Sequence, residues 1–256
     1  VSLGKSLLGK ELFALDLRPV LPGERLPALL AGAFHGMEWI TASLLLQFAR
    51  EVCGEVQAGR VPMPRGVLFV PCVNPDGVDI QLHGAKAAGS FYRLAERFET
   101  DRWQANARGV DLNHNFDAKW HKLRELERRA GITGPGPTQF GGWRPESEPE
   151  SHALAAFCRQ TELACAVALH SQGEEIYYAF GRRTPPEAYA LAEAMAQVSG
   201  YAVASPEGLA SFGGFKDWFI EEFGRPGFTI EVGKGKNPLP LSQFDAISEK
   251  LAPMLY

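Results

Sequence analysis

The sequence predicts an α/β fold, a sheet with helices on both faces, because two patterns alternate along the chain. Short continuous apolar runs bounded by Gly, Pro or Asn are typical of strands buried on both faces, and amphipathic helical patterns lie between them. No linker or internal repeat divides the 256 residues. Domains usually span roughly 100 to 200 residues, so one large domain or two small ones would fit this length. We expect a single domain that covers residues 1–256.

Five apolar runs rich in Val, Leu and Phe predict the strands. In chain order they occupy residues 12–17, 26–34, 66–73, 164–169 and 228–232. None approaches the roughly 18 residues needed to cross a bilayer, so we expect no membrane span.

Three helices are predicted from apolar residues that recur on one face. One begins near Thr41, and another covers residues 241–251. A third follows Ser147, where Glu150 three residues later completes the pattern of a capping box.

Two further segments are irregular or strongly charged. The Gly- and Pro-rich residues 131–143 predict a long loop, which is a candidate lid over a site. Residues 119–129 carry five Lys or Arg residues interleaved with Glu125 and Glu127, which indicates a solvated helix face rather than an anion site.

The charge balance excludes some classes of partner. With 26 Lys and Arg against 30 Asp and Glu, the formal net charge is -4, which gives no general attraction for nucleic acid or anionic lipid. The chain starts without a charged and then apolar leader, and it carries no wall-anchoring repeat. We therefore expect a cytoplasmic location, or a secreted one if a signal peptide has been removed.

Metal-ligating side chains follow two of the predicted strands. His35 and Glu38 come directly after residues 26–34, and His170 comes directly after residues 164–169. Sites in open α/β sheets form at the carboxyl ends of strands, and Zn²⁺ accepts both imidazole and carboxylate ligands. These three residues are a candidate metal site, although a His-x-x-Glu pair alone is also common on ordinary surfaces.

A carboxylate also ends the last predicted strand. Glu231 lies among apolar residues, where burial raises a carboxyl pKa towards the range that suits a general base. A buried ion pair is the alternative, and the residues alone leave it open.

Together these residues resemble the zinc carboxypeptidase family of the carboxypeptidase A type, whose motifs occur here in the same order. The matching segments are FHGMEWIT (34–41), NPDG (74–77), GVDLNHNF (109–116), LHS (169–171) and TIEVG (229–233). The resemblance implies a mixed, twisted sheet of roughly eight strands with helices on both faces, and a zinc-dependent peptidase.

The resemblance also implies roles for particular residues. His35, Glu38 and His170 become ligands of one Zn²⁺, and Glu231 becomes the general base that accepts a proton from water. Asp111 resembles the carboxylate that orients the first histidine ligand. Arg108 is the candidate for the cation that stabilises the oxyanion, with Arg102 as its competitor.

Three departures from the family bear on the substrate. Family members carry Asn-Arg at the position of Asn113-His114, and that arginine clamps the terminal carboxylate of the substrate. The family's mobile tyrosine is missing from residues 206–214. Lys216 stands at the base of the family's leaving-group pocket, which implies an anionic group there; a solvated lysine on an amphipathic helix is the alternative. We therefore expect Asn113, His114 and Lys216 to bind substrate.

Within the family, the chain resembles bacterial γ-D-glutamyl-meso-diaminopimelate peptidases. The supporting segments are SQGEEIYY (171–178), GFKDWF (214–219), RPGFTIEVG (225–233), NPLP (237–240) and TGPGP (133–137). The resemblance implies that the partners are peptidoglycan stem peptides or their soluble fragments. A metallocarboxypeptidase for ordinary L-peptides and a catalytically inactive module that binds cell-wall fragments are the alternatives.

Overall fold

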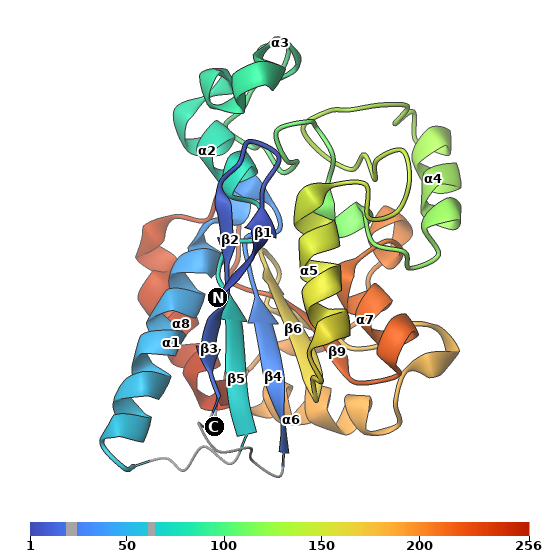
Figure 1. Cartoon of the computed structure of the whole chain (residues 1–256). Helices are drawn as coiled ribbons and strands as arrows, with labels where there is room; N and C mark the ends of the chain where they lie inside the picture. The colour runs from blue at the N-terminus through green and yellow to red at the C-terminus, as the bar shows by residue number, and fades with distance from the viewer. Residues whose placement is uncertain (19–24, 61–64, 256) are drawn as a thin grey trace.

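The fold contains a mixed seven-stranded sheet and a separate two-stranded sheet (Figure 1). The computed structural model describes residues 1–18, 25–60 and 65–255. Its strands are β1 (Ser2–Lys5), β2 (Glu11–Phe13), β3 (Leu15–Leu17), β4 (Arg25–Ala31), β5 (Arg65–Val70), β6 (Cys165–His170), β7 (Glu175–Tyr177), β8 (Ala202–Ala204) and β9 (Gly227–Glu231). Its helices are α1 (Ile40–Gln57), α2 (Pro75–His83), α3 (Tyr92–Ala95), α4 (Trp120–Arg129), α5 (Pro149–Gln160), α6 (Glu187–Ser199), α7 (Phe215–Phe223) and α8 (Phe244–Leu251).

The larger sheet confirms the predicted fold class. Its strand order is β3-β5-β4-β6-β9-β7-β8, one strand fewer than the roughly eight expected. Strands β5, β4, β6 and β9 run parallel to one another, whereas β3 and β7 are antiparallel to their neighbours β5 and β9. The carboxyl ends of β4, β6 and β9 therefore lie together at one edge of the sheet.

Alternating residues of the central strands pack into two cores, one on each face of the sheet. In β5, Leu68 belongs to the core that also contains residues of α5 and α7, whereas Phe69 belongs to the core with residues of α1 and α8. Figure 1 shows the same division of the helices between the two faces. Burial on both faces explains why these strands are continuously apolar in sequence.

The predicted strand over residues 12–17 is wrong as a single element. Before Ala14 this segment forms β2, which pairs with β1, and after Ala14 it forms β3, which pairs with β5. Phe13 is 58% exposed while Ala14 is buried, so the switch between sheets interrupts an apolar run that appears continuous in sequence.

The predicted capping box is also wrong. Helix α5 has Glu148 at its N-cap position and begins at Pro149, without a side-chain cap. The Glu150 carboxylate instead accepts a hydrogen bond of 2.8 Å from the backbone N–H of Leu7, in the turn between β1 and β2. The Glu150 carboxylate therefore makes a contact with a distant segment in place of the predicted contact at the start of its own helix.

The charged helix α4 is less solvated than its sequence indicates. Glu127 is fully buried, where its Oε1 accepts a hydrogen bond from Gly141 N at 3.0 Å, and its other oxygen pairs with the guanidinium of Arg124. The 131–143 loop is irregular, as predicted. Its backbone is hydrogen-bonded to residues 104–111, for example from Asp111 N to Phe140 O at 2.8 Å. These bonds hold the loop against that segment, which does not favour the predicted lid.

None of the helices in the described part of the chain combines the length and the apolar character that a bilayer span requires.

Candidate metal centre and active site

Three parallel strands bring the candidate site residues together. His170 and Glu231 are the last residues of β6 and β9, and the register of the sheet pairs them directly. His35 follows β4, which neighbours β6 on its other side, and Glu38 ends a short 3₁₀ turn (Gly36–Glu38) that leads into α1.

The turn that carries His35 is held by a motif from the next strand end. The Asn74 side chain accepts a hydrogen bond from Gly77 N at 2.9 Å and donates one to Phe34 O at 3.1 Å. A Cβ atom on Gly36 would lie 2.3 Å from Gly77 O, so the close approach of the two segments requires glycine at position 36. The NPDG segment (74–77) therefore fixes the backbone of the turn that carries His35, a role that its sequence match did not reveal.

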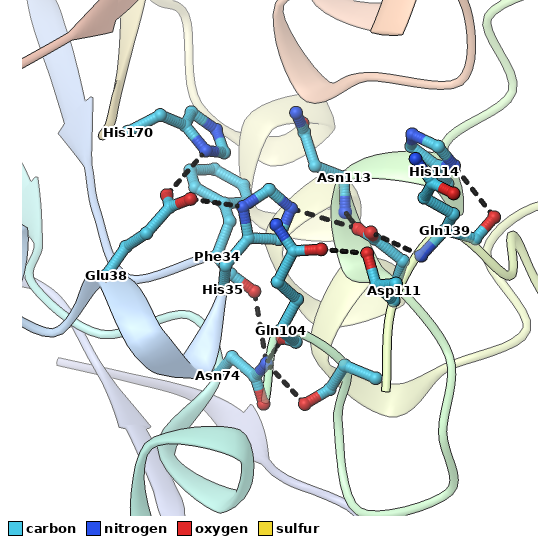
Figure 2. A network of polar contacts seen from close by, with 12 residues as sticks. Phe34, His35, Glu38, Asn74, Gln104, Asp111, Asn113, His114, Gln139 and His170 are labelled. Atoms are coloured by element: carbon cyan, nitrogen blue, oxygen red, sulfur yellow. Dashed lines mark hydrogen bonds and ion pairs between the residues drawn. The ribbon is translucent and has the colours of Figure 1, made fainter. Parts of the chain in front are cut away.

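The three predicted metal ligands, His35, Glu38 and His170, lie together in a group that could hold a metal ion (Figure 2). Nδ1 of His35 lies 2.9 Å from Glu38 Oε1, and Nδ1 of His170 lies 3.0 Å from Glu38 Oε2. One ligand atom from each of the three residues can be chosen so that all lie within 4.8 Å of one another. Two imidazoles and one carboxylate are a donor set that suits catalytic zinc.

Asp111 contacts the first histidine, where the sequence predicts an orienting carboxylate. Its Oδ1 lies 3.0 Å from Nε2 of His35. A carboxylate at this position favours the proton on Nε2, which leaves Nδ1 free to bind a metal. The ring of His170 stacks on Phe34 with centroids 5.1 Å apart, which restricts its rotation.

The electrostatics of the group also suit a cation. Burial alone would lower the pKa of His35, but the carboxylates of Glu38 and Asp111 raise it well above its ordinary value. Burial would raise the pKa of Glu38, yet His35 and His170 bring it down to about 2. The carboxylates thus remain ionised and favour positive charge at the point between the imidazoles, where a metal ion would replace the proton.

Glu231, the predicted general base, has a raised pKa. Burial, and next the neighbouring carboxylate of Glu38, raise its pKa well above the ordinary value, with Glu175 acting in the same direction. A carboxylate with a raised pKa accepts a proton more readily near neutral pH. Among the described residues it has no ion-pair partner, so the alternative of a buried ion pair is not what the structure shows.

Arg108 pairs with a carboxylate outside this group. Its Nε lies 3.0 Å from Glu148 Oε2, on the segment that leads into α5. Arg102 is exposed. The oxyanion role of Arg108 therefore stays a prediction.

Asn113 and His114 lie on either side of the Asp111 carboxylate. The Asn113 backbone donates to Asp111 Oδ1 at 3.1 Å, and its side-chain oxygen accepts from Phe215 N at 3.0 Å. Figure 2 shows the side-chain nitrogen of Asn113 directed away from Asp111. His114 is buried, with Nδ1 at 3.0 Å from Gln139 O and 3.3 Å from Glu127 Oε1.

Lys216 is not a solvated lysine, because it is only 4% exposed. Its ammonium donates to Ala179 O at 2.9 Å and pairs closely with the carboxylate of Asp217. An ammonium has three N–H donors. Two are used within the described part of the chain, so one N–H has no acceptor there.

Comparison with known proteins shows the family to which the chain belongs. The model of the zinc carboxypeptidase family matches residues 1–253. The chain belongs to the zinc carboxypeptidase family. This confirms the resemblance found in the sequence, and the family is one of metallopeptidases.

Relatives in the family differ in their substrates. The chain is 36% identical over 232 residues to γ-D-glutamyl-L-diamino acid endopeptidase 1 of Lysinibacillus sphaericus, covering 85% of this chain but only 57% of that protein. It is 26% identical over 276 residues to human carboxypeptidase B, covering 97% of this chain and 61% of that protein. The chain thus spans a little over half the length of these two relatives.

Solved structures share the fold. Murein-tripeptide amidase MpaA from Escherichia coli O157 aligns with a TM-score of 0.63 at 24% identity, over 100% of this chain and 90% of that chain. Thrombin activatable fibrinolysis inhibitor aligns with a TM-score of 0.75 at 21% identity, over 100% of this chain and 66% of that chain. Both identities are low, so these likenesses support the fold alone.

Proposed function

We propose that residues 1–256 form one catalytic domain of a zinc peptidase that hydrolyses the γ-D-glutamyl-meso-diaminopimelate bond of peptidoglycan stem peptides or their soluble fragments. The observation that carries the proposal is the convergence of His35, Glu38 and His170 beside Glu231, in a chain 36% identical to a γ-D-glutamyl-L-diamino acid endopeptidase.

His35, Glu38 and His170 would hold the zinc ion, with Asp111 fixing the tautomer of His35. Zn²⁺ in such a site supplies Lewis-acid polarisation of the scissile carbonyl and lowers the pKa of water. Glu231 removes a proton from the attacking water and delivers it to the nitrogen of the leaving amine.

Substrate binding is assigned to Asn113, His114 and Lys216. The amide N–H groups of Asn113, which point away from Asp111 in Figure 2, would donate to a substrate oxygen. The unused N–H of Lys216 would bind the carboxylate at the end of the diaminopimelate side chain. Nδ1 of His114 is already engaged with Gln139 O, and an imidazole does not form the bidentate clamp that an arginine gives. Because the carboxylate-binding arginine of the family is replaced by His114, the proposed site does not require a substrate with a free terminal carboxylate.

A metallocarboxypeptidase for ordinary L-peptides is the second candidate, because the chain is 26% identical to human carboxypeptidase B. His114 and the lack of a tyrosine in residues 206–214 count against it.

The deciding experiment loads the protein with one equivalent of Zn²⁺ and follows products by mass spectrometry. The substrates are L-Ala-γ-D-Glu-meso-diaminopimelate, with and without a terminal D-Ala, and an ordinary L-peptide. Release of L-Ala-D-Glu supports the proposal, whereas trimming of only the L-peptide favours the second candidate. In the same assay, Arg108→Ala tests the oxyanion role: a loss of roughly 100-fold in kcat is expected if the arginine acts on the oxyanion, and little change if it serves only Glu148.

A further inference from the structure

The sheet places two unassigned polar residues on the same face as the metal group and the base. Across β6, β9 and β7, the register aligns His170 with Glu231 and Glu231 with Glu175. The adjacent row on β9 and β7 aligns Thr229 with Tyr177. Paired residues share a face of a sheet, so Glu175 and Tyr177 lie on the face of Glu231. The intervening Ile176 packs in the core of the opposite face.

Strand spacing gives the position of Glu175 relative to the reaction. Neighbouring strands are about 4.8 Å apart, so Glu175 lies one strand from Glu231 and two strands, or roughly 10 Å, from His170. A substrate group that reaches Glu175 therefore lies beyond the base when viewed from the metal group.

The contacts of Glu175 leave it without a compensating positive charge. The Tyr177 hydroxyl donates to its Oε2 at 2.6 Å. No lysine, arginine or histidine in the described part of the chain pairs with it. The adjacent Glu174, in contrast, has the ammonium groups of both Lys234 and Lys250 as partners.

The lack of a partner is unusual because Glu175 stands directly opposite another carboxylate. Like charges at directly opposed positions of an antiparallel pair destabilise the sheet. Burial and then the Glu175 carboxylate raise the pKa of Tyr177, so its hydroxyl stays protonated and its single proton is committed to Glu175. One carboxylate oxygen of Glu175 has no donor among the described residues, and a positive charge from a ligand would relieve the repulsion.

A buried ammonium lies beyond the other end of β7. The Lys216 ammonium donates to Ala179 O, two residues beyond Tyr177, whereas Glu175 is the first residue of the strand. The carboxylate and the ammonium are therefore at opposite ends of this short strand.

We infer that Glu175, oriented by Tyr177, is a specificity-determining residue that binds a cationic ammonium group of the substrate next to the catalytic base. This inference rests on the proposed function, and it names the residue that reads the amino group of the diamino acid.

The test measures kcat and KM for four γ-D-glutamyl peptides that differ in one side chain. The residue after D-Glu is diaminopimelate (ammonium and carboxylate), lysine (ammonium only), 2-aminopimelate (carboxylate only) or norleucine (neither). Glu175→Gln should lower kcat/KM by about 10- to 100-fold for the first two, mainly through KM, because a hydrogen bond to a charged group is lost. The other two should change by less than about threefold, and Tyr177→Phe should give the same pattern at a smaller size.

Glu174→Gln is the matched control, because it removes the same charge from the adjacent residue, whose partners are Lys234 and Lys250. Zinc content and the thermal midpoint of each variant are measured alongside. Equal losses on all four peptides with Glu175→Gln, or losses of the same pattern with Glu174→Gln, would overturn the inference.

The two proposals can fail separately. If the wild-type protein cleaves none of the γ-D-glutamyl peptides but trims ordinary peptides, the proposed function is wrong. The same variants are then compared on peptides ending in lysine and in norleucine. A loss confined to lysine supports Glu175 as the cation-binding residue, and equal losses refute it. If nothing is cleaved, equilibrium binding of the lysine and norleucine peptides to the zinc-loaded protein gives the same comparison.

Discussion

Asp111→Asn should weaken zinc binding because it removes the carboxylate that accepts the proton of His35 Nε2. The Asp111 carboxylate accepts three hydrogen bonds, from His35 Nε2 at 3.0 Å, from Asn113 N at 3.1 Å and from Gln139 N at 3.0 Å. The first two reach Oδ1 and the third reaches Oδ2. An amide keeps only one acceptor oxygen, so one side of this network must face an NH₂ group.

Both orientations of the asparagine carry a cost. If its oxygen faces His35, the N–H of Gln139 loses its acceptor in a partly buried contact, at roughly 0.5–1.5 kcal/mol of unfolding free energy. If its NH₂ faces His35, the imidazole must place its proton on Nδ1, the atom that lies 2.9 Å from Glu38. Either way the negative charge that helps to raise the pKa of His35 is lost. We expect zinc affinity to fall about 10- to 100-fold, or roughly 1.4–2.7 kcal/mol.

The assay is competition for zinc against a chromophoric chelator, combined with urea unfolding of the metal-free protein. Asp117→Asn is the matched control, because Asp117 is exposed and lies six residues along the same segment. An Asp111→Asn variant that folds normally and binds zinc as tightly as the wild type would refute the proposed role of the Asp111–His35 contact.

Three further predictions follow from other parts of the structure. Glu231→Gln should retain zinc but lose about 100- to 10,000-fold in kcat, the contribution of a general base, and near-normal turnover would exclude Glu231 from that role. Burial raises the pKa of Glu150 to about 7, above the value of about 4.5 expected in the unfolded chain. The folded state therefore binds more protons between pH 4.5 and 7, so this group makes the unfolding free energy decrease by roughly 3 kcal/mol as pH rises through that window. Glu150→Gln should remove that part of the slope in urea titrations at pH 5 and pH 7.5, and an unchanged slope would contradict the assignment. Phe215 packs against Phe34, Phe116 and Trp218, so Phe215→Ala should lower the unfolding free energy by about 3–5 kcal/mol, measured by urea unfolding; a loss below about 1 kcal/mol would show that the cluster is loosely packed.

The grouping of His35, Glu38 and His170 was predictable because His35 and His170 directly follow apolar runs and Glu38 comes three residues after His35. The rule that parallel strands end at one edge made them a candidate site, and the resemblance to the zinc carboxypeptidase family gave them the role of ligands. The same rule placed Glu231. The continuous apolar runs also predicted the fold class correctly, because strands that are buried on both faces of a sheet are apolar along their whole length.

Local patterns failed where a distant segment competed for the same side chain. Glu150 satisfies every sequence requirement of a capping box, but its carboxylate accepts from Leu7, more than a hundred residues earlier. Glu127 sits among charges that indicate a solvated helix, yet it is fully buried against the 131–143 loop. Glu175 could not be assigned because β7 is only three residues long, and its antiparallel pairing with β9 is visible only in the sheet.

His170, Glu231 and Glu175 lie side by side on β6, β9 and β7, so the two carboxylates lie at different distances from the metal group. A positive charge at the metal group would lie about one strand spacing from Glu231 and about two from Glu175. At an effective dielectric constant of about 20, the attraction to a unit charge is roughly 3.5 kcal/mol at 4.8 Å and about half of that at twice the distance. In the proposed function, Glu231 would therefore interact more strongly with the metal ion than Glu175 would, which suits Glu231 to accept the proton of a water molecule there. Strand order places Glu175 farther from the metal group while keeping it on the same face, where we propose that it binds a substrate cation.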